Sequence, residues 1–246
     1  MSKSTVRLDT SQQKEIYNNF RYLSDRYGKW ETWSDFIRLS ACSLCASDRD
    51  EREREYIDTI KRYRQEDIER FPKMFALTVD ALEQNPYQDF LGDLFMRFDL
   101  SNTWKGQFFT PYSICEAMSA ITAGDLTAQL EDKPWISVND PACGAGALLI
   151  AFAQECSRQK VNYQQSVLFA AQDIDRTAAL MCFVQLSLLG CAGYVVVGDS
   201  LLNPTVGPSV LLPVKQDGQE IWYTPMMYTG IWQYRLALEK IKHTPQ

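Results

Sequence analysis

The chain has 246 residues, of which 46% are hydrophobic and 12% aromatic, a composition that favours a packed core and argues against a disordered protein. No stretch approaches the roughly 20 uninterrupted apolar residues of a membrane helix, and residues 1–10 are too polar for a signal peptide, so we expect a cytoplasmic protein. The formal net charge is −6 without a long Lys/Arg cluster, whereas a protein that grips DNA unaided through many phosphates normally shows a basic face. For a nucleic-acid substrate we therefore expect either a partner that supplies much of the grip or a local basic patch formed by the fold.

Residues 1–100 are predicted to form a helical N-terminal region. Apolar and aromatic residues recur at three- and four-residue spacing in residues 11–27 and 30–45, which is typical of amphipathic helices. Residues 47–70 alternate acids and bases around a spaced apolar stripe, so we expect one solvated helix there. Two further helices, residues 73–83 and 87–98, follow Pro72 and Pro86.

Cysteine and histidine offer little for a metal site. The seven cysteines are scattered, and only Cys42 and Cys45 form a C-x-x-C pair. The sole histidine is His243, so a tetrahedral ligand set is missing and we expect no metal.

Residues 101–246 are predicted to form an α/β domain. Apolar runs at 135–139, 167–171 and 194–197 alternate with amphipathic helices at 147–160 and 177–189. Such a series gives parallel strands with right-handed crossovers, and therefore a doubly wound, Rossmann-like sheet.

Three polar motifs follow the three predicted strands, at the edge where such sheets bind ligands. The first is Asp140-Pro141-Ala142-Cys143-Gly144-Ala145-Gly146, a turn whose glycines allow close approach and which leads into a helix N-terminus that favours an anion. The second motif, at the end of the second strand, contains Asp173, suited to ribose hydroxyls, and the third contains Asp199, suited to an adenine amino group. Each feature alone is typical of turns and caps, but together they predict a site for a nucleoside with an anionic tail.

Two of these motifs resemble DNA adenine-N6 methyltransferases, above all the modification subunits of type I restriction systems. Gly106-Gln107-Phe108-Phe109-Thr110-Pro111 precedes the glycine turn, and Gly198-Asp199-Ser200-Leu201 follows later, so the likeness covers about residues 100–202. It implies S-adenosylmethionine (SAM) as cofactor, DNA as substrate, and a specificity or other protein partner. The residues that it places at the cofactor are Phe109, Thr110, Asp140, Pro141, Ala142, Cys143, Gly144, Gly146, Asp173, Ile174, Asp199 and Ser200.

The family's N/D-P-P-F/Y motif, which holds the target amino group, is missing from this sequence. Asn203-Pro204 matches two letters but follows Asp199 closely, whereas Thr224, Pro225 and Tyr228 lie nearer the expected spacing. A threonine hydroxyl cannot reproduce the acceptor geometry of an amide.

Three interpretations remain open. The protein is a DNA adenine methyltransferase with a divergent catalytic loop built from Thr224, Pro225 and Tyr228. Alternatively, it binds SAM without transferase activity and acts as a partner subunit, regulator or anti-restriction factor. The third interpretation is a methyltransferase for a substrate other than DNA.

Overall fold

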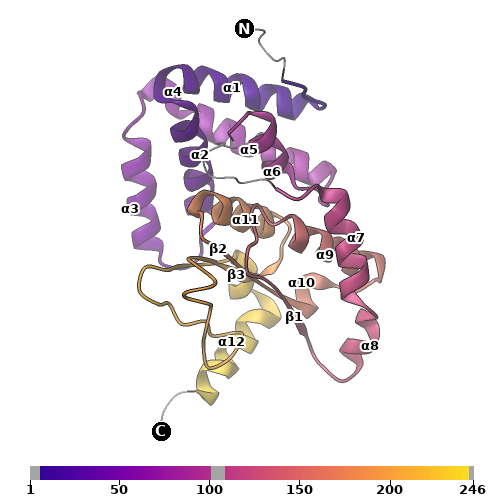
Figure 1. Ribbon diagram of the computed structural model, residues 1–246. Helices are drawn as coiled ribbons and strands as arrows, with labels where there is room; N and C mark the ends of the chain where they lie inside the picture. The colour runs from indigo at the N-terminus through magenta and orange to yellow at the C-terminus, as the bar shows by residue number, and fades with distance from the viewer. Residues whose placement is uncertain (1–5, 101–108, 244–246) are drawn as a thin grey trace.

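The computed structural model describes residues 6–100 and 109–243. A helical region precedes a four-stranded sheet flanked by helices (Figure 1). The helical region contains α1 (Ser11–Tyr27), α2 (Lys29–Leu44), α3 (Arg49–Ile60), α4 (Gln65–Ile68), α5 (Arg70–Gln84) and α6 (Phe90–Arg97). The sheet region contains α7 (Tyr112–Ala123), α8 (Leu126–Glu131), β1 (Ile136–Asp140), α9 (Ala147–Arg158), α10 (Tyr163–Ser166), β2 (Val167–Asp173), α11 (Arg176–Leu188), β3 (Ala192–Val197), β4 (Glu220–Tyr223), the 3-10 helix η1 (Pro225–Tyr228) and α12 (Gly230–Lys242).

The helical region confirms four of the five predicted helices and corrects one. The single helix expected over residues 47–70 is wrong, since α3 ends at Ile60 and the short α4 begins only at Gln65. Tertiary contacts stabilise the break: Tyr63 is buried, and its hydroxyl donates to Asp35 Oδ2 at 2.8 Å. The next residue, Arg64, donates its backbone N–H to the Tyr27 hydroxyl at 3.1 Å. Alternating charge on α3 could not reveal these distant partners.

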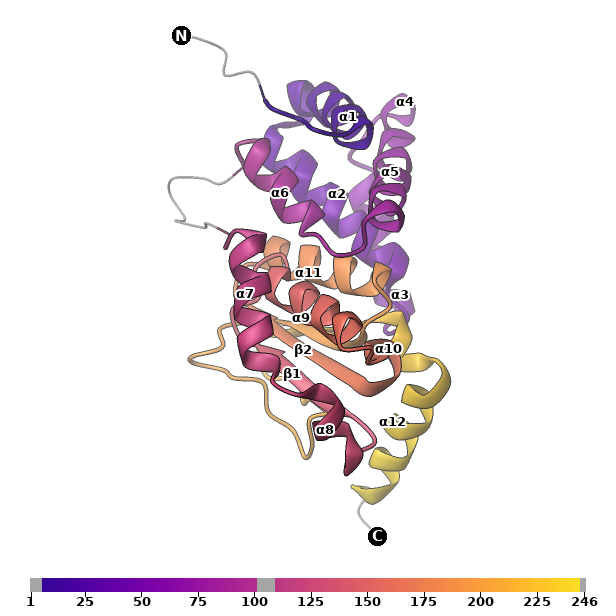
Figure 2. The same cartoon turned by 90° about the vertical axis from the view of Figure 1, so that its right-hand side faces the viewer.

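The sheet has the strand order β1-β2-β3-β4, and its first three strands are parallel. Helices α9 and α11 connect these strands, and their apolar residues join the main core together with Phe169 and Val195 of the sheet. Helix α12 packs against the opposite face at Leu168 and Ala192, so helices lie on both faces (Figure 2). The predicted mixed α/β architecture is confirmed.

Strand β4 runs antiparallel to β3, with Tyr223 opposite Tyr194 and Glu220 opposite Val197. Residues 198–219, which connect the two strands, contain no helix, and Pro204, Pro208 and Pro213 oppose one. Parallel strands need a crossover connection, usually a helix, so the chain returns antiparallel. The C-terminal end of β4 therefore lies at the end of the sheet where β1, β2 and β3 begin.

One hydrophobic core joins the helical region to the sheet. It includes Trp33 and Phe95 of the helical region together with Phe183 of α11 and Trp222 of β4. Buried Gln185 of α11 adds polar links between the two regions. Its side-chain amide donates to Asp89 Oδ1 and to the Ala145 carbonyl, both at 2.8 Å, and its oxygen accepts from the Leu91 N–H.

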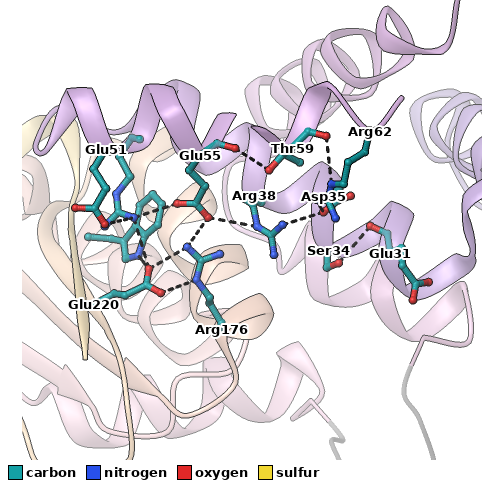
Figure 3. Close-up of polar contacts among 12 residues, drawn as sticks. Glu31, Ser34, Asp35, Arg38, Glu51, Glu55, Thr59, Arg62, Arg176 and Glu220 are labelled. Carbon is teal, nitrogen blue, oxygen red and sulfur yellow. Dashed lines mark hydrogen bonds and ion pairs between the residues drawn. The ribbon is translucent and has the colours of Figure 1, made fainter. Parts of the chain in front are cut away.

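A network of charged side chains forms a second link between the regions (Figure 3). Arg176 of α11 contacts Glu220 of β4 and Glu55 of α3, both at 2.7 Å. The guanidinium of Arg52 lies 3.7 Å from the centre of the Trp222 ring and 3.1 Å from Glu55. Helix α3 is thereby fixed to the β4 edge of the sheet.

No helix within the described ranges combines the length and the apolar character needed to cross a membrane.

Candidate cofactor site

The glycine turn after β1 adopts backbone conformations that side chains disfavour. Gly144 has φ +53° and Gly146 has φ +98°, both in the left-handed region that glycine tolerates. A Cβ on Gly144 would lie 3.0 Å from the Phe109 ring, and one on Gly146 would lie 2.9 Å from Cys182 Sγ. Both glycines are therefore required by the backbone and by close packing.

Asp173, at the end of β2, holds this turn in place. Its Oδ2 accepts a hydrogen bond from the Gly144 N–H and its Oδ1 accepts one from the Asp175 N–H, both at 2.8 Å. Each carboxylate oxygen has a further lone pair, so Asp173 can brace the turn and still accept from a ligand hydroxyl.

The two helices that follow β1 and β2 begin differently. Asp175 caps α11 by accepting from the N–H groups of Thr177 and Ala178. Helix α9 begins after Gly146, which has no side chain with which to accept these donors. The first N–H groups of α9 are therefore available to an anionic ligand.

Asp199 follows β3 and shapes the third loop. Its Oδ1 accepts from the N–H groups of Leu201 and Leu202, at 2.9 and 3.1 Å. The neighbouring apolar side chains are unusually open to solvent: Ile174 is 70% exposed and Leu201 is 92% exposed. A planar aromatic ligand could cover such side chains.

These loops line a single cavity of about 410 Å³, within the range of about 300–1,000 Å³ typical of small-molecule sites. It brings together eleven of the twelve predicted cofactor residues. They are Phe109, Thr110, Asp140, Pro141, Ala142, Cys143, Gly144, Asp173, Ile174, Asp199 and Ser200. The twelfth, Gly146, does not line the cavity and packs against Cys182. Gly106, Gln107 and Phe108, which begin the motif that precedes the glycine turn in the sequence, lie outside the described residues.

The sequence did not predict several apolar residues of the cavity wall. They are Cys115, Ala145, Ala147, Leu148, Ala178 and Leu201. Ala147, Leu148 and Ala178 occupy the first turns of α9 and α11. Their positions directly after the strand ends were the available signal, since ligands in such sheets meet the helix starts as well as the loops.

The carboxyl groups that line the cavity can interact with a cation. Burial raises the pKa of Asp173 above its ordinary value of 3.8, and the pKa of Asp140 is raised by burial and by the negative charge of Asp173. Asp199 lines the same cavity. A positive group bound between these carboxylates would favour their ionised forms.

The predicted catalytic residues lie elsewhere. Thr224 is fully buried, and its hydroxyl donates to the Cys191 carbonyl at 2.7 Å and accepts from the Gly193 N–H at 3.0 Å. These partners flank the start of β3, whereas the cavity lies beyond its end. Gly193 and Val197 alone are about 13 Å apart at 3.3 Å per residue.

Pro225 and Tyr228 follow Thr224 at the same end of the sheet, opposite the end that carries the cavity. Pro225 lines a separate hollow with Cys42 and Arg52, and the Tyr228 ring packs against Tyr223. The antiparallel direction of β4 thus separates Thr224, Pro225 and Tyr228, the predicted catalytic residues, from the cofactor cavity. In contrast, Asn203 does not line the cavity but is bonded to a residue that does, since its backbone N–H donates to the Asp199 carbonyl at 2.8 Å.

Cys42 and Cys45 are free thiols, and burial raises the pKa of Cys42 to about 12. Over the described residues, no group of three or more His, Cys, Asp or Glu side chains is arranged to hold a metal ion.

Comparison with known proteins gives a family match and three similar chains of solved structures. Residues 88–217, more than half of the chain, match the family model N-6 DNA Methylase. A solved structure from Listeria monocytogenes, described as a class I SAM-dependent methyltransferase, is 16% identical with a TM-score of 0.45. The similarity covers 94% of this chain and 69% of that one. No curated protein matches. The matched segment spans the glycine turn, Asp173 and Asp199, and on this match the chain belongs to the N-6 DNA methylase family.

Proposed function

We propose that this protein binds SAM in the cavity at the ends of β1, β2 and β3 and serves in adenine-N6 methylation of DNA within a restriction-modification system. One observation carries the proposal: loops from three strands line one shared cavity that has a glycine turn, an uncapped helix start and three carboxylates.

The residues of the cavity fit the chemical groups of SAM. The N–H groups at the start of α9 suit the methionine carboxylate. Asp173 can accept from the ribose hydroxyls, and Asp199 can accept from the adenine amino group. The sulfonium and ammonium charges of SAM offset the cluster of acids. The sulfonium supplies an already activated methyl group.

The residues that would hold the methyl acceptor are less complete than those that would hold SAM. Methyl transfer needs groups that hold the target nitrogen in line with the methyl. Thr224, which was predicted to take the place of the motif's Asn, lies at the end of the sheet opposite the cavity. This observation favours the second interpretation of the sequence for the isolated chain, namely that it binds SAM without transferring the methyl group unaided. We therefore expect the protein to act as the cofactor-binding member of a methylating complex.

Calorimetric titration with SAM tests the cofactor assignment. We expect binding to the parent protein, and a loss of about tenfold or more for Asp173→Ala, because that change frees the Gly144 N–H and removes a ligand acceptor. Asp217→Ala, at an exposed position in the connection before β4, is the matched control. Absence of SAM binding to the parent protein would refute the assignment.

Transfer of a tritiated methyl group to mixed-sequence DNA tests activity. The isolated chain should give no incorporation. The competing candidate is a divergent acceptor loop at Asn203-Pro204, shortly after the lining residues Asp199, Ser200 and Leu201. Incorporation by the isolated chain that disappears in Asn203→Ala and persists in Thr224→Ser would establish that candidate instead.

A further inference from the structure

Strand β1 has one open edge. It pairs with β2 on one side, and within the described part of the chain no strand pairs with its other side. Ser137 and Asn139 of β1 are exposed, although parallel sheets are normally covered on both faces. Exposed edges are usually blunted by Lys, Pro or a bulge. The β1 sequence Ile-Ser-Val-Asn-Asp has neither Lys nor Pro.

A groove runs along this open edge and joins the cofactor cavity. It has a volume of about 480 Å³ and lies between β1 and helices α7, α8 and α9. Asp140, Pro141 and Leu148 line both the groove and the cofactor cavity. A segment seated on the edge of β1 would therefore end beside bound cofactor.

Apolar side chains of α7 continue the groove outward. Met118 lines it and is 43% exposed. Ile114 and Ile121, one helical turn before and after Met118, are 50% and 81% exposed. Such exposed apolar surface beside an unpaired strand is typical of a site that receives an apolar strand through main-chain hydrogen bonds.

The charges around the groove are mainly negative. Asp125 lies just before α8, and Glu131 and Asp132 lie at its end, all exposed, and the exposed base Lys133 follows them. Asp140, Asp173 and Asp199 surround the adjoining cavity. This rim repels DNA phosphates and attracts a basic polypeptide.

We propose that the open edge of β1 receives a β-strand with basic flanks from a partner polypeptide. The added strand pairs with β1, packs its apolar side chains on Met118 and the groove, and presents the residues beyond it to the cofactor cavity. Strand docking rests on the proposed function, because such a partner would supply both the groups that hold the target amino group and the positive surface for DNA.

Short peptides provide the probe. A display library of strand-forming peptides, with apolar residues at alternate positions and lysines at both ends, is selected against the full chain, and the selected peptides are measured by fluorescence anisotropy. We expect Met118→Glu to weaken them by about tenfold or more, since it places a charge in an apolar contact. Ala120→Glu, at an exposed position on the same helix that neither lines the groove nor belongs to its apolar continuation, is the matched control and should have little effect.

Backbone N-methylation of a selected peptide tests strand pairing directly. Methyl groups on alternate residues block one edge of the peptide. Methylation of the residues that face β1 should therefore abolish binding, and methylation of the intervening residues should retain it. Equal behaviour of the two frames, or no peptide enriched over the Met118→Glu protein, would overturn the proposal. A dimer of the free chain that Met118→Glu dissociates would also overturn it, since a second copy would then occupy the edge.

Calorimetry with SAM on the same samples separates the two proposals. Peptide binding without SAM binding would refute the proposed function and leave strand docking supported. SAM binding without peptide binding would refute strand docking and leave the cofactor assignment supported.

Discussion

Gly144 is constrained by both its backbone and its neighbour Phe109. Gly144→Ala puts a side chain into a positive-φ conformation and 3.0 Å from the Phe109 ring, so we expect SAM affinity to fall by about tenfold, or roughly 1.4 kcal/mol. Titration calorimetry measures the change. Gly218→Ala is the control, because Gly218 has φ +78° with no atom within 4 Å of the added Cβ. Equal loss of affinity in both variants would contradict a specific role for the turn.

The buried carboxylates predict how cofactor binding depends on pH. Burial raises the pKa of Asp140 and Asp173 above 3.8, and a bound sulfonium favours their ionised forms. SAM affinity should therefore be greatest above these raised pKa values and fall as the pH drops through them. In the free protein the sign is opposite, because a raised folded-state pKa makes these groups favour folding more at acid pH than at neutral pH.

Calorimetry between about pH 4 and pH 7 checks this prediction, since the α-amino and α-carboxyl groups of SAM change charge little in that interval. Proton release on binding at the acid end, seen as a dependence on buffer ionisation enthalpy, would accompany the loss of affinity. A pH-independent affinity would show that the carboxylates do not meet the positive charge of the ligand.

At the scale of elements, α3 is attached to the sheet by Arg52. This side chain is 5% exposed, contacts Glu55 and Glu220, and lies over the Trp222 ring. Arg52→Met keeps most of the apolar stem but removes the charge between two acids, so we expect the free energy of unfolding to fall by about 3 kcal/mol. Urea denaturation measures it. Arg54→Met on the exposed side of α3 should change stability by less than about 0.5 kcal/mol, and a similar loss there would contradict the role of the network.

The elements also show how far the sequence alone could lead. Regular apolar spacing and the motifs that follow residues 139, 171 and 197 predicted β1, β2, β3 and the loops that meet in the cavity, because these features are local. The break after α3 depends on Asp35 and Tyr27 and could not be read locally. The direction of β4 was available in the sequence, since the prolines between residues 203 and 214 oppose the crossover helix that a parallel strand requires.

At the scale of the molecule, the two edges of the sheet are treated differently. The β4 edge is joined to α3 by the charged network, and Trp222 is fully buried there. The β1 edge adjoins the cofactor cavity and is open. The helical region therefore holds the β4 edge through the charged network, while within the described residues the β1 edge beside the cofactor cavity has no strand partner.

The continuous core predicts that the helical region and the sheet unfold together. Gln185 is 1% exposed and connects Asp89 and Leu91 of the helical region to Ala145 of the glycine turn. Gln185→Leu leaves these buried partners unsatisfied and should lower the free energy of unfolding by about 3 kcal/mol. Because the lost bonds join both regions, native-state hydrogen exchange in α2 and in β3 should accelerate by the same factor. Faster exchange in α2 with β3 unchanged would show instead that residues before 100 form an independently unfolding unit.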